Sequence, residues 1–203
     1  MTDAAALERF EALVLGQAAA SVPWTPPIGV DYSFEARKVI EGKHPQLIKD
    51  VFQPTRVLDF GCGPDARLAR LLSDIGVTVE GYDPQRIEGQ FWSTVNTAYF
   101  DLVIYREVNE HLTVRQMARV VRQVCALSTR FVYGTTRFHP SPSHMLDVAT
   151  SDDLDPTHIS LVTQPFLRML CVLEGFARRA DLEARMDWKQ LGRVLVYERV
   201  DVA

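Results

Sequence analysis

The sequence has few cysteines, no excess of positive charge and no long hydrophobic run, and each shortage argues against a class of protein. Its three cysteines, Cys62, Cys125 and Cys171, lie far apart and form no Cys-x-x-Cys pair. This spacing argues against a zinc knuckle or a disulfide framework and favours a reducing, cytoplasmic setting. A net charge of -4 gives no overall attraction to nucleic acid or to an anionic membrane. No apolar stretch approaches membrane-spanning length, and acidic residues near the start are unlike a secretory signal.

The composition is that of an ordinary globular protein. The chain has 203 residues, of which 47% are hydrophobic and 24% charged, so it is long enough to bury a core of its own. Residues 4–20 are rich in alanine and leucine with an apolar face, which predicts an amphipathic helix. A second helix is expected over 34–52, with Pro45 as an interruption.

The most informative stretch runs from Arg56 to Asp65. The apolar residues Val57, Leu58 and Phe60 form a short run that predicts a strand buried on both faces. Gly61 and Gly63 then interrupt it, and residues 66–72 return to apolar residues at helical spacing. A strand, a glycine turn and a helix together present bare backbone and a helix N-terminus to a ligand.

The charge beside this turn indicates which kind of ligand binds. Residues 61–66 fit the dinucleotide pattern Gly-x-Gly-x-x-Gly/Ala, which by itself is also compatible with a plain strand-to-helix turn. Asp59, two residues before the first glycine, would repel a pyrophosphate and attract a cationic ligand. The sequence therefore disfavours a dehydrogenase.

The run Leu58-Asp59-Phe60-Gly61-Cys62-Gly63-Pro64 resembles motif I of the class I S-adenosylmethionine-dependent methyltransferases. The resemblance implies that Asp59 faces the methionine end of the cofactor and that Gly61, Cys62 and Gly63 pass beneath it. Asp83, followed by Pro84, lies roughly twenty residues after the turn at the end of a second predicted strand. In this family an acidic residue there binds the ribose hydroxyls; the alternative is an aspartate that caps a turn.

The same resemblance predicts the fold. We expect an α/β, Rossmann-like, doubly wound sheet of seven strands, mostly parallel with an antiparallel C-terminal strand, and helices on both faces. Because relatives commonly cover the cofactor with N-terminal helices, residues 1–52 are predicted to form a helical lid and 53–203 the methyltransferase domain, in one compact unit. Between 84 and 100 the chain is too short for the family's usual helix, strand and helix, so residues 91–95 are expected to be a remnant of the third strand. Phe91 and Trp92 there are candidates for adenine stacking.

Later elements follow from apolar periodicity and from turn residues. Thr113 is expected to cap a helix, and the loop over 139–156 is a candidate for substrate entry because of its length. The expected strands are 100–105, 130–133, one within 176–186 and 194–200, and the expected helices are 114–127 and 164–173.

A second cluster of candidate residues lies after the strand at 100–105. Glu107, Glu110 and His111 stand at i, i+3 and i+4, so a helical turn would place them on one face, and His158 could approach them. The set resembles the Glu-x-x-Glu-His plus distant His arrangement of small-RNA 2′-O-methyltransferases, which implies a divalent metal (Mg, Mn or Zn) held by all four residues. The Glu-Val-x-Glu-His run is also similar to ubiquinone-biosynthesis O-methyltransferases. Glu107 is also a candidate for cofactor binding.

Interpretations of these residues without a metal site also remain open. The two glutamates could complement the dipole at a helix start, His111 could be a metal-free base, and His158 could only stabilise a loop. We take His111, Glu110 and His158 as the catalytic candidates.

The predicted function is S-adenosylmethionine-dependent O-methylation of a small hydroxylated metabolite or sugar. A metal-dependent RNA 2′-O-methyltransferase is the first alternative: the Glu and His set favours it, and the negative net charge disfavours it. A methyltransferase-like protein that binds cofactor or a partner without turnover is the second. No membrane partner is expected, and the sequence does not define the oligomeric state.

Overall fold

The computed structural model describes residues 42–63, 65–83, 99–139, 146–148, 158, 160–189 and 191–200. Several predictions lie outside these residues: most of the N-terminal lid, Pro84, the strand remnant at 91–95 with Phe91 and Trp92, and most of the loop over 139–156. The division of the chain at residue 52 also stays a prediction.

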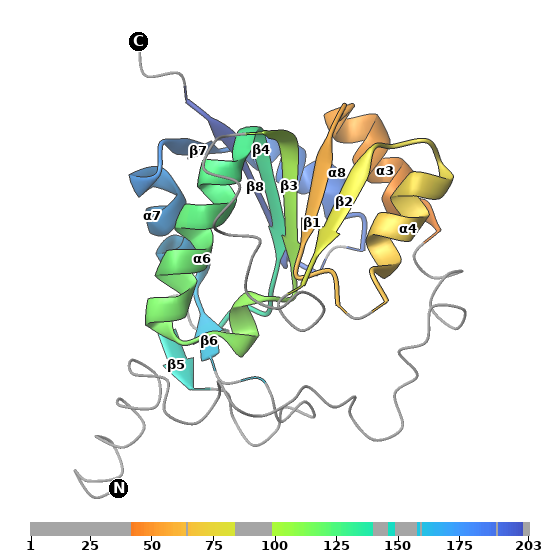
Figure 1. Ribbon diagram of the computed structural model, residues 1–203. Helices are drawn as coiled ribbons and strands as arrows, with labels where there is room; N and C mark the ends of the chain where they lie inside the picture. The colour runs from red at the N-terminus through yellow and green to blue at the C-terminus, as the bar shows by residue number, and fades with distance from the viewer. Residues whose placement is uncertain are drawn as a thin grey trace, which may run out of the picture.

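A sheet of six strands forms the centre of the described part of the molecule (Figure 1). In spatial order its strands are β2 (Val79–Tyr82), β1 (Val57–Phe60), β3 (Phe100–Arg106), β4 (Ser128–Thr135), β8 (Val194–Arg199) and β7 (Phe176–Arg178). The pairs β1–β2, β1–β3 and β3–β4 are parallel, whereas β8 runs antiparallel to both β4 and β7. The mostly parallel sheet with an antiparallel C-terminal strand is therefore confirmed. The predicted strand remnant at 91–95 lies outside the described residues, so the count of seven strands stays a prediction.

Helices cover both faces of this sheet (Figure 1). The helices are α3 (Lys43–Phe52), α4 (Arg67–Asp74), α6 (Val114–Leu127), α7 (Gln164–Leu173) and α8 (Ala180–Met186), with one 3-10 turn, η1 (Asn109–His111). A small second sheet pairs β5 (Leu146–Val148) with β6 (Ser160–Val162). No helix in the described part of the chain is both long and apolar enough to cross a bilayer.

Alternation along the buried strands separates two apolar cores. Leu58 of β1 and Val103 of β3 pack with residues of α6 and α7, whereas their neighbours Val57 and Leu102 pack with residues of α3, α4 and α8. Successive side chains of a strand point to opposite faces, so continuous apolar runs supply both cores. This explains why these strands lack the alternation of polar and apolar residues that a half-buried strand would show.

Two helix starts follow from local chemistry. The Thr113 hydroxyl accepts a hydrogen bond from the Gln116 backbone N–H, and the Gln116 side-chain oxygen accepts one from the Thr113 backbone N–H, which forms the capping box at the start of α6. The described part of the predicted helix over 34–52 is α3, which begins at Lys43, and residues 34–41 lie outside the described part, so the expected interruption stays a prediction. Pro45 lies in the first turn of α3, where its missing N–H would have no partner within the helix.

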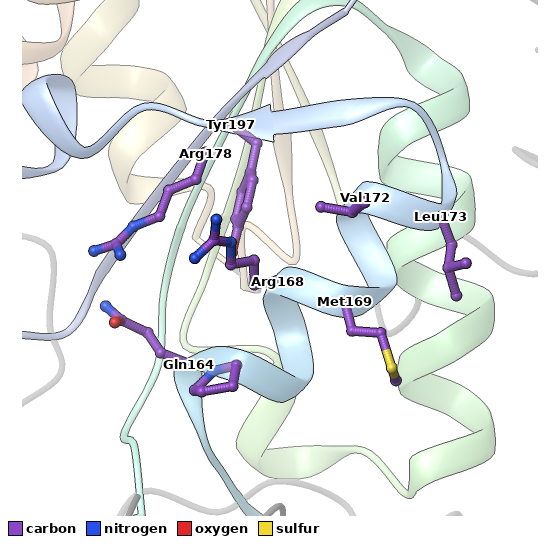
Figure 2. A pocket seen from close by; sticks show the side chains of 8 residues that line it. Gln164, Arg168, Met169, Val172, Leu173, Arg178 and Tyr197 are labelled. Carbon is purple, nitrogen blue, oxygen red and sulfur yellow. The ribbon is translucent and has the colours of Figure 1, made fainter.

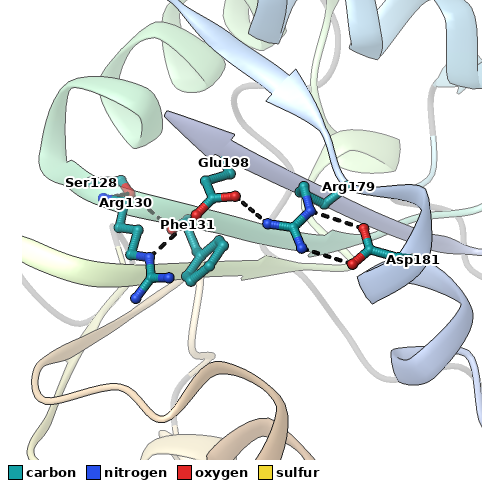
Figure 3. A network of polar contacts seen from close by, with 6 residues as sticks. All are labelled: Ser128, Arg130, Phe131, Arg179, Asp181 and Glu198. Atoms are coloured by element: carbon teal, nitrogen blue, oxygen red, sulfur yellow. Dashed lines mark hydrogen bonds and ion pairs between the residues drawn. The ribbon is translucent and has the colours of Figure 1, made fainter. Parts of the chain in front are cut away.

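Ion pairs connect the antiparallel edge of the sheet (Figure 3). Glu198 of β8 accepts a hydrogen bond from Arg130 Nε of β4 at 3.3 Å and a second one from Arg179, which follows β7. Arg179 also pairs with Asp181 at 2.7 Å, and this hydrogen bond lowers the pKa of the Asp181 carboxyl to about 2. These side chains are at least partly exposed, so each ion pair contributes little to stability.

Candidate active site at the carboxyl ends of the strands

The order of the strands locates the site. From β1 the chain passes to β2 on one side and then returns to β3 on the other side of β1. Such a reversal leaves a crevice at the carboxyl ends of the parallel strands, because the two connections leave in opposite directions. The candidate residues lie at the carboxyl ends of four strands. The glycine turn follows β1, Asp83 follows β2, the segment from Glu107 to His111 follows β3, and Thr135 and Thr136 lie at the end of β4.

The glycine turn after β1 needs glycine for two reasons. Gly61 and Gly63 have φ values of +74° and +70°, which side chains rarely adopt. A Cβ on Gly61 would also lie 2.5 Å from Cγ2 of Val108. The Gly61 and Cys62 N–H groups both donate to the carbonyl of Tyr82, at 2.7 and 3.1 Å, and so tie the turn to β2.

The two predicted acids both lie at this turn. Asp59 is 3% exposed and sits within β1, between Gly81 of β2 and Ile104 of β3. The Oδ2 atom of Asp83 accepts a hydrogen bond of 2.9 Å from the Gly63 N–H. The structure therefore brings Asp83 to the turn across twenty residues of sequence, and this carboxylate holds the turn whatever else it binds.

Glu107 directly follows β3 in a strained conformation. Its φ is +52°, which is uncommon for a residue with a side chain and typically costs 1–3 kcal/mol. Two bonds to β4 hold it there: its N–H donates to the Thr135 carbonyl at 2.8 Å, and its Oε1 accepts from the Thr135 hydroxyl at 2.7 Å. Such strain, held by the surrounding structure, is typical of functional sites.

Glu110 is a buried carboxyl that keeps its proton. It is 1% exposed, and its Oε2 accepts a 2.8 Å hydrogen bond from the Thr136 hydroxyl. Burial, the charge of Glu107 and a hydrogen bond with Glu107 raise the pKa of Glu110 well above its usual value. Burial also raises the pKa of Glu107, but hydrogen bonds from Glu110 and Thr135 outweigh this and lower it. The pair therefore shares one proton, with Glu110 as the donor and Glu107 as the carboxylate.

The two predicted histidines do meet. The ring centroids of His111 and His158 lie 4.8 Å apart, with 60° between the ring planes. His158 thus approaches His111 from a segment 47 residues further along the chain, as the sequence suggested. His111 is the last residue of η1, so the pair lies at the end of η1 that is farther along the chain from β3.

The predicted metal site does not form. The part of the chain that the structure describes contains no group of three or more ligating side chains placed to hold a metal ion. The physical reason is that the two carboxyls turn inward to hydroxyls of β4 and to each other, whereas the imidazoles form a separate pair.

Three residues of this site were missed from the sequence. Thr135 and Thr136 hold the two glutamates, but the predicted strand ended at Tyr133, so both lay beyond it. Val108, which packs over Gly61, looked like one more apolar residue. Two threonines directly after a buried strand are the signal that could have found the first two, because strand ends at this edge line the crevice.

An open, doubly wound sheet with a glycine turn at its switch point defines the class of cofactor-binding α/β domains. The sequence matches a methyltransferase domain family over residues 32–178. The chain therefore belongs to the methyltransferase domain family. No curated protein matched the sequence.

Solved structures with a similar fold include methyltransferases of distant sequence. Magnesium protoporphyrin IX methyltransferase from Synechocystis PCC 6803, solved with S-adenosylmethionine bound, has a TM-score of 0.55 and 15% identity, covering 98% of this chain and 99% of that one. The 1,6-didemethyltoxoflavin-N1-methyltransferase of Burkholderia thailandensis has a TM-score of 0.56 and 14% identity, covering 98% and 90%. An S-adenosylmethionine-dependent methyltransferase from Archaeoglobus fulgidus has a TM-score of 0.55 and 15% identity, covering 83% and 100%. At these identities the likeness shows the fold.

Proposed function

We propose that this protein binds S-adenosylmethionine at the glycine turn and methylates an oxygen of a small hydroxylated metabolite or sugar. One observation carries the proposal: two aspartates, one within β1 and one bonded to Gly63, flank a turn whose two glycines adopt positive φ. A sulfonium cofactor carries positive charge at its methionine end and hydroxyls at its ribose. Acids on both sides of a bare backbone suit that ligand and oppose a dinucleotide phosphate.

Each side chain has an assigned part. Asp59 faces the methionine end, Asp83 accepts from the ribose hydroxyls, and Gly61 to Gly63 lie under the cofactor, together with Pro84 from beyond the described residues. Glu107 borders the same crevice at the end of β3, where its strained backbone turns the chain toward η1. When bound, the cofactor supplies an electrophilic methyl group.

We assign the base to His111. An imidazole titrates near neutral pH, so it can take the proton that an acceptor hydroxyl loses as its oxygen is methylated. His158, with its ring 4.8 Å away, is placed to orient His111 or the acceptor. Glu110 supports this assignment as a buried anchor, since its bonds to Thr136 and Glu107 fix the turn that carries His111.

The two alternatives differ in what they require. RNA 2′-O-methylation, as the resemblance implies it, uses a metal held by all four Glu and His residues, and these residues do not fit that group here. No observation specifically favours a protein without turnover. Binding of S-adenosylhomocysteine combined with no methyl transfer to any acceptor class would favour it.

Calorimetry with S-adenosylhomocysteine tests the cofactor site. We expect the wild type to bind and Asp83→Asn to bind about tenfold or more weakly, because the asparagine loses charge-assisted bonds to ribose. Its amide oxygen can still accept from the Gly63 N–H, so the turn is kept. Asp74→Asn, an exposed change at the end of α4, is the matched control and should bind as the wild type does. Absent binding by the wild type, or full affinity in Asp83→Asn, would contradict the proposal.

A radiolabelled methyl-transfer screen tests the chemistry. Hydroxylated small molecules, amines and RNA serve as separate acceptor groups, and His111→Ala is compared with the wild type. We expect transfer to hydroxylated small molecules and loss of at least 100-fold in His111→Ala, in line with the contribution of a general base. Transfer to RNA alone would overturn the acceptor assignment.

A further inference from the structure

A hollow lies on the surface between α7, β7 and β8, at the opposite edge of the sheet from β2 (Figures 1 and 2). Its volume is about 340 Å³, and a second cavity of about 360 Å³ adjoins it and shares Arg168, Val172 and Arg178. This size lies within the range of small-molecule sites. The hollow shares no residue with the glycine turn or with the segment from Glu107 to His111.

One side of the hollow is an exposed apolar strip. Met169, Val172 and Leu173 on α7 are 44%, 53% and 72% exposed. Large apolar side chains gathered next to a cavity are typical of a binding surface, since water gains by leaving them. Figure 2 shows Val172 on the same side of α7 as Arg168, and Met169 and Leu173 on the adjoining side.

The other side of the hollow presents hydrogen-bond donors. Within the described part of the chain, Arg168 forms no ion pair or hydrogen bond, whereas its neighbour Arg178 is paired with Glu183 at 2.6 Å. The Tyr197 side chain is fully buried, and its hydroxyl has no hydrogen-bond partner among the described residues. Burial raises the pKa of Tyr197, so this hydroxyl keeps its proton and can donate. Figure 2 shows Arg168 beside Tyr197.

The Tyr197 hydroxyl is costly to leave without a partner because it is buried, whereas the exposed Arg168 guanidinium is hydrated and can exchange that water for an acceptor. A carboxylate can bind both the Arg168 guanidinium and the Tyr197 hydroxyl, because its two oxygens accept hydrogen bonds and its charge neutralises Arg168. The apolar strip next to these donors suits an alkyl chain attached to that carboxylate. We propose that the hollow binds a linear amphipathic carboxylate of medium chain length, with its head on Arg168 and Tyr197 and its chain along Met169 and Val172.

Decanoate, kept below its critical micelle concentration, is the probe, and calorimetry on the full chain is the measurement. We expect decanoate to bind, and decanol, which lacks the charge, to bind at least tenfold more weakly. Butyrate, which lacks the chain, should also bind more weakly. Equal affinity for decanoate and decanol would overturn the proposal, because the donors would then contribute nothing.

Two substitutions locate the site. Arg168→Gln removes an exposed charge from α7 and should weaken decanoate binding about tenfold or more, and Tyr197→Phe should weaken it several-fold. Arg115→Gln, an equally exposed change on α6, is the matched control and should leave the affinity unchanged. Full affinity in Arg168→Gln would overturn the assignment, and circular dichroism checks that both variants are folded.

An anionic lipid surface, which also offers negative charge and alkyl chains, needs its own comparison. Sedimentation with phosphatidylglycerol vesicles is run beside the decanoate titration, and we expect decanoate to bind and the vesicles not to retain the protein. Retention by vesicles together with no decanoate binding would replace a small-molecule site by a lipid-surface contact. The test does not depend on methyl transfer, so its failure would leave the proposed function untouched.

Discussion

We expect His44 to make the protein sensitive to acid. This histidine of α3 is 6% exposed, and its Nε2 lies 2.8 Å from the hydroxyl of Tyr133, itself buried in β4. Burial, and then the positive charges of Arg106 and Lys189, lower the pKa of His44 from 6.5 to about 2. The folded protein therefore keeps His44 neutral at pH values where the unfolded chain protonates it.

The sign and size of the effect follow from linkage. Between pH 2 and 6.5 the unfolded state binds more protons than the folded one, so this contribution to stability is complete above pH 6.5 and declines as the pH falls. The loss is about 1.4 kcal/mol for each pH unit below 6.5, or about 2.7 kcal/mol between pH 8 and pH 4.5. Because the pKa of His44 in the folded protein lies far below 4.5, the size of this loss depends only on the pKa of His44 in the unfolded chain.

Urea unfolding of the wild type and His44→Gln over this pH range measures the effect. Glutamine stays neutral and its amide can still bond to the Tyr133 hydroxyl, whereas the carboxylates common to both proteins cancel in the comparison. We expect the stability difference to shift by about 2.7 kcal/mol in favour of His44→Gln as the pH falls from 8 to 4.5. Curves that stay parallel would refute the reasoning.

Three further predictions concern the site. Gly61→Ala should cost about 1–3 kcal/mol of stability, because Gly61 has a φ of +74° and a Cβ there would lie 2.5 Å from Val108. The same variant should bind S-adenosylhomocysteine more weakly. Adding Val108→Ala should recover part of the lost stability, and no recovery would mean that the contact with Val108 is irrelevant. Glu110→Gln mimics the protonated carboxyl, so the wild type should become progressively less stable than this variant as the pH rises above 4.5, as measured by urea unfolding. Thr136→Val should cost about 1–3 kcal/mol by leaving the buried Glu110 Oε2 without its donor; an unchanged unfolding midpoint would argue against that bond.

The strand, the glycine turn and the helix from Val57 to Asp74 could be predicted because local chemistry decides them. Three apolar residues in a strand of four, two glycines at positive φ and an apolar helical face leave few other structures for that stretch. The helix α6 and its Thr113 cap were predicted for the same reason, as were the bounds of α7. Each depends on residues within a few positions of one another.

What the amino-acid order could not decide is which polar groups end up facing each other. The four Glu and His residues suggested one metal site, but the fold places Thr135 and Thr136 under the two glutamates and leaves the histidines as a separate pair. Those threonines belong to a strand paired with β3, and their distance to Glu107 depends on sheet register, to which many distant contacts contribute. The sequence determined which titratable and hydrogen-bonding side chains this chain carries. The sheet decided which of them contact one another, because burial raises the pKa of Glu110 and the pairing of β4 with β3 brings Thr136 to it.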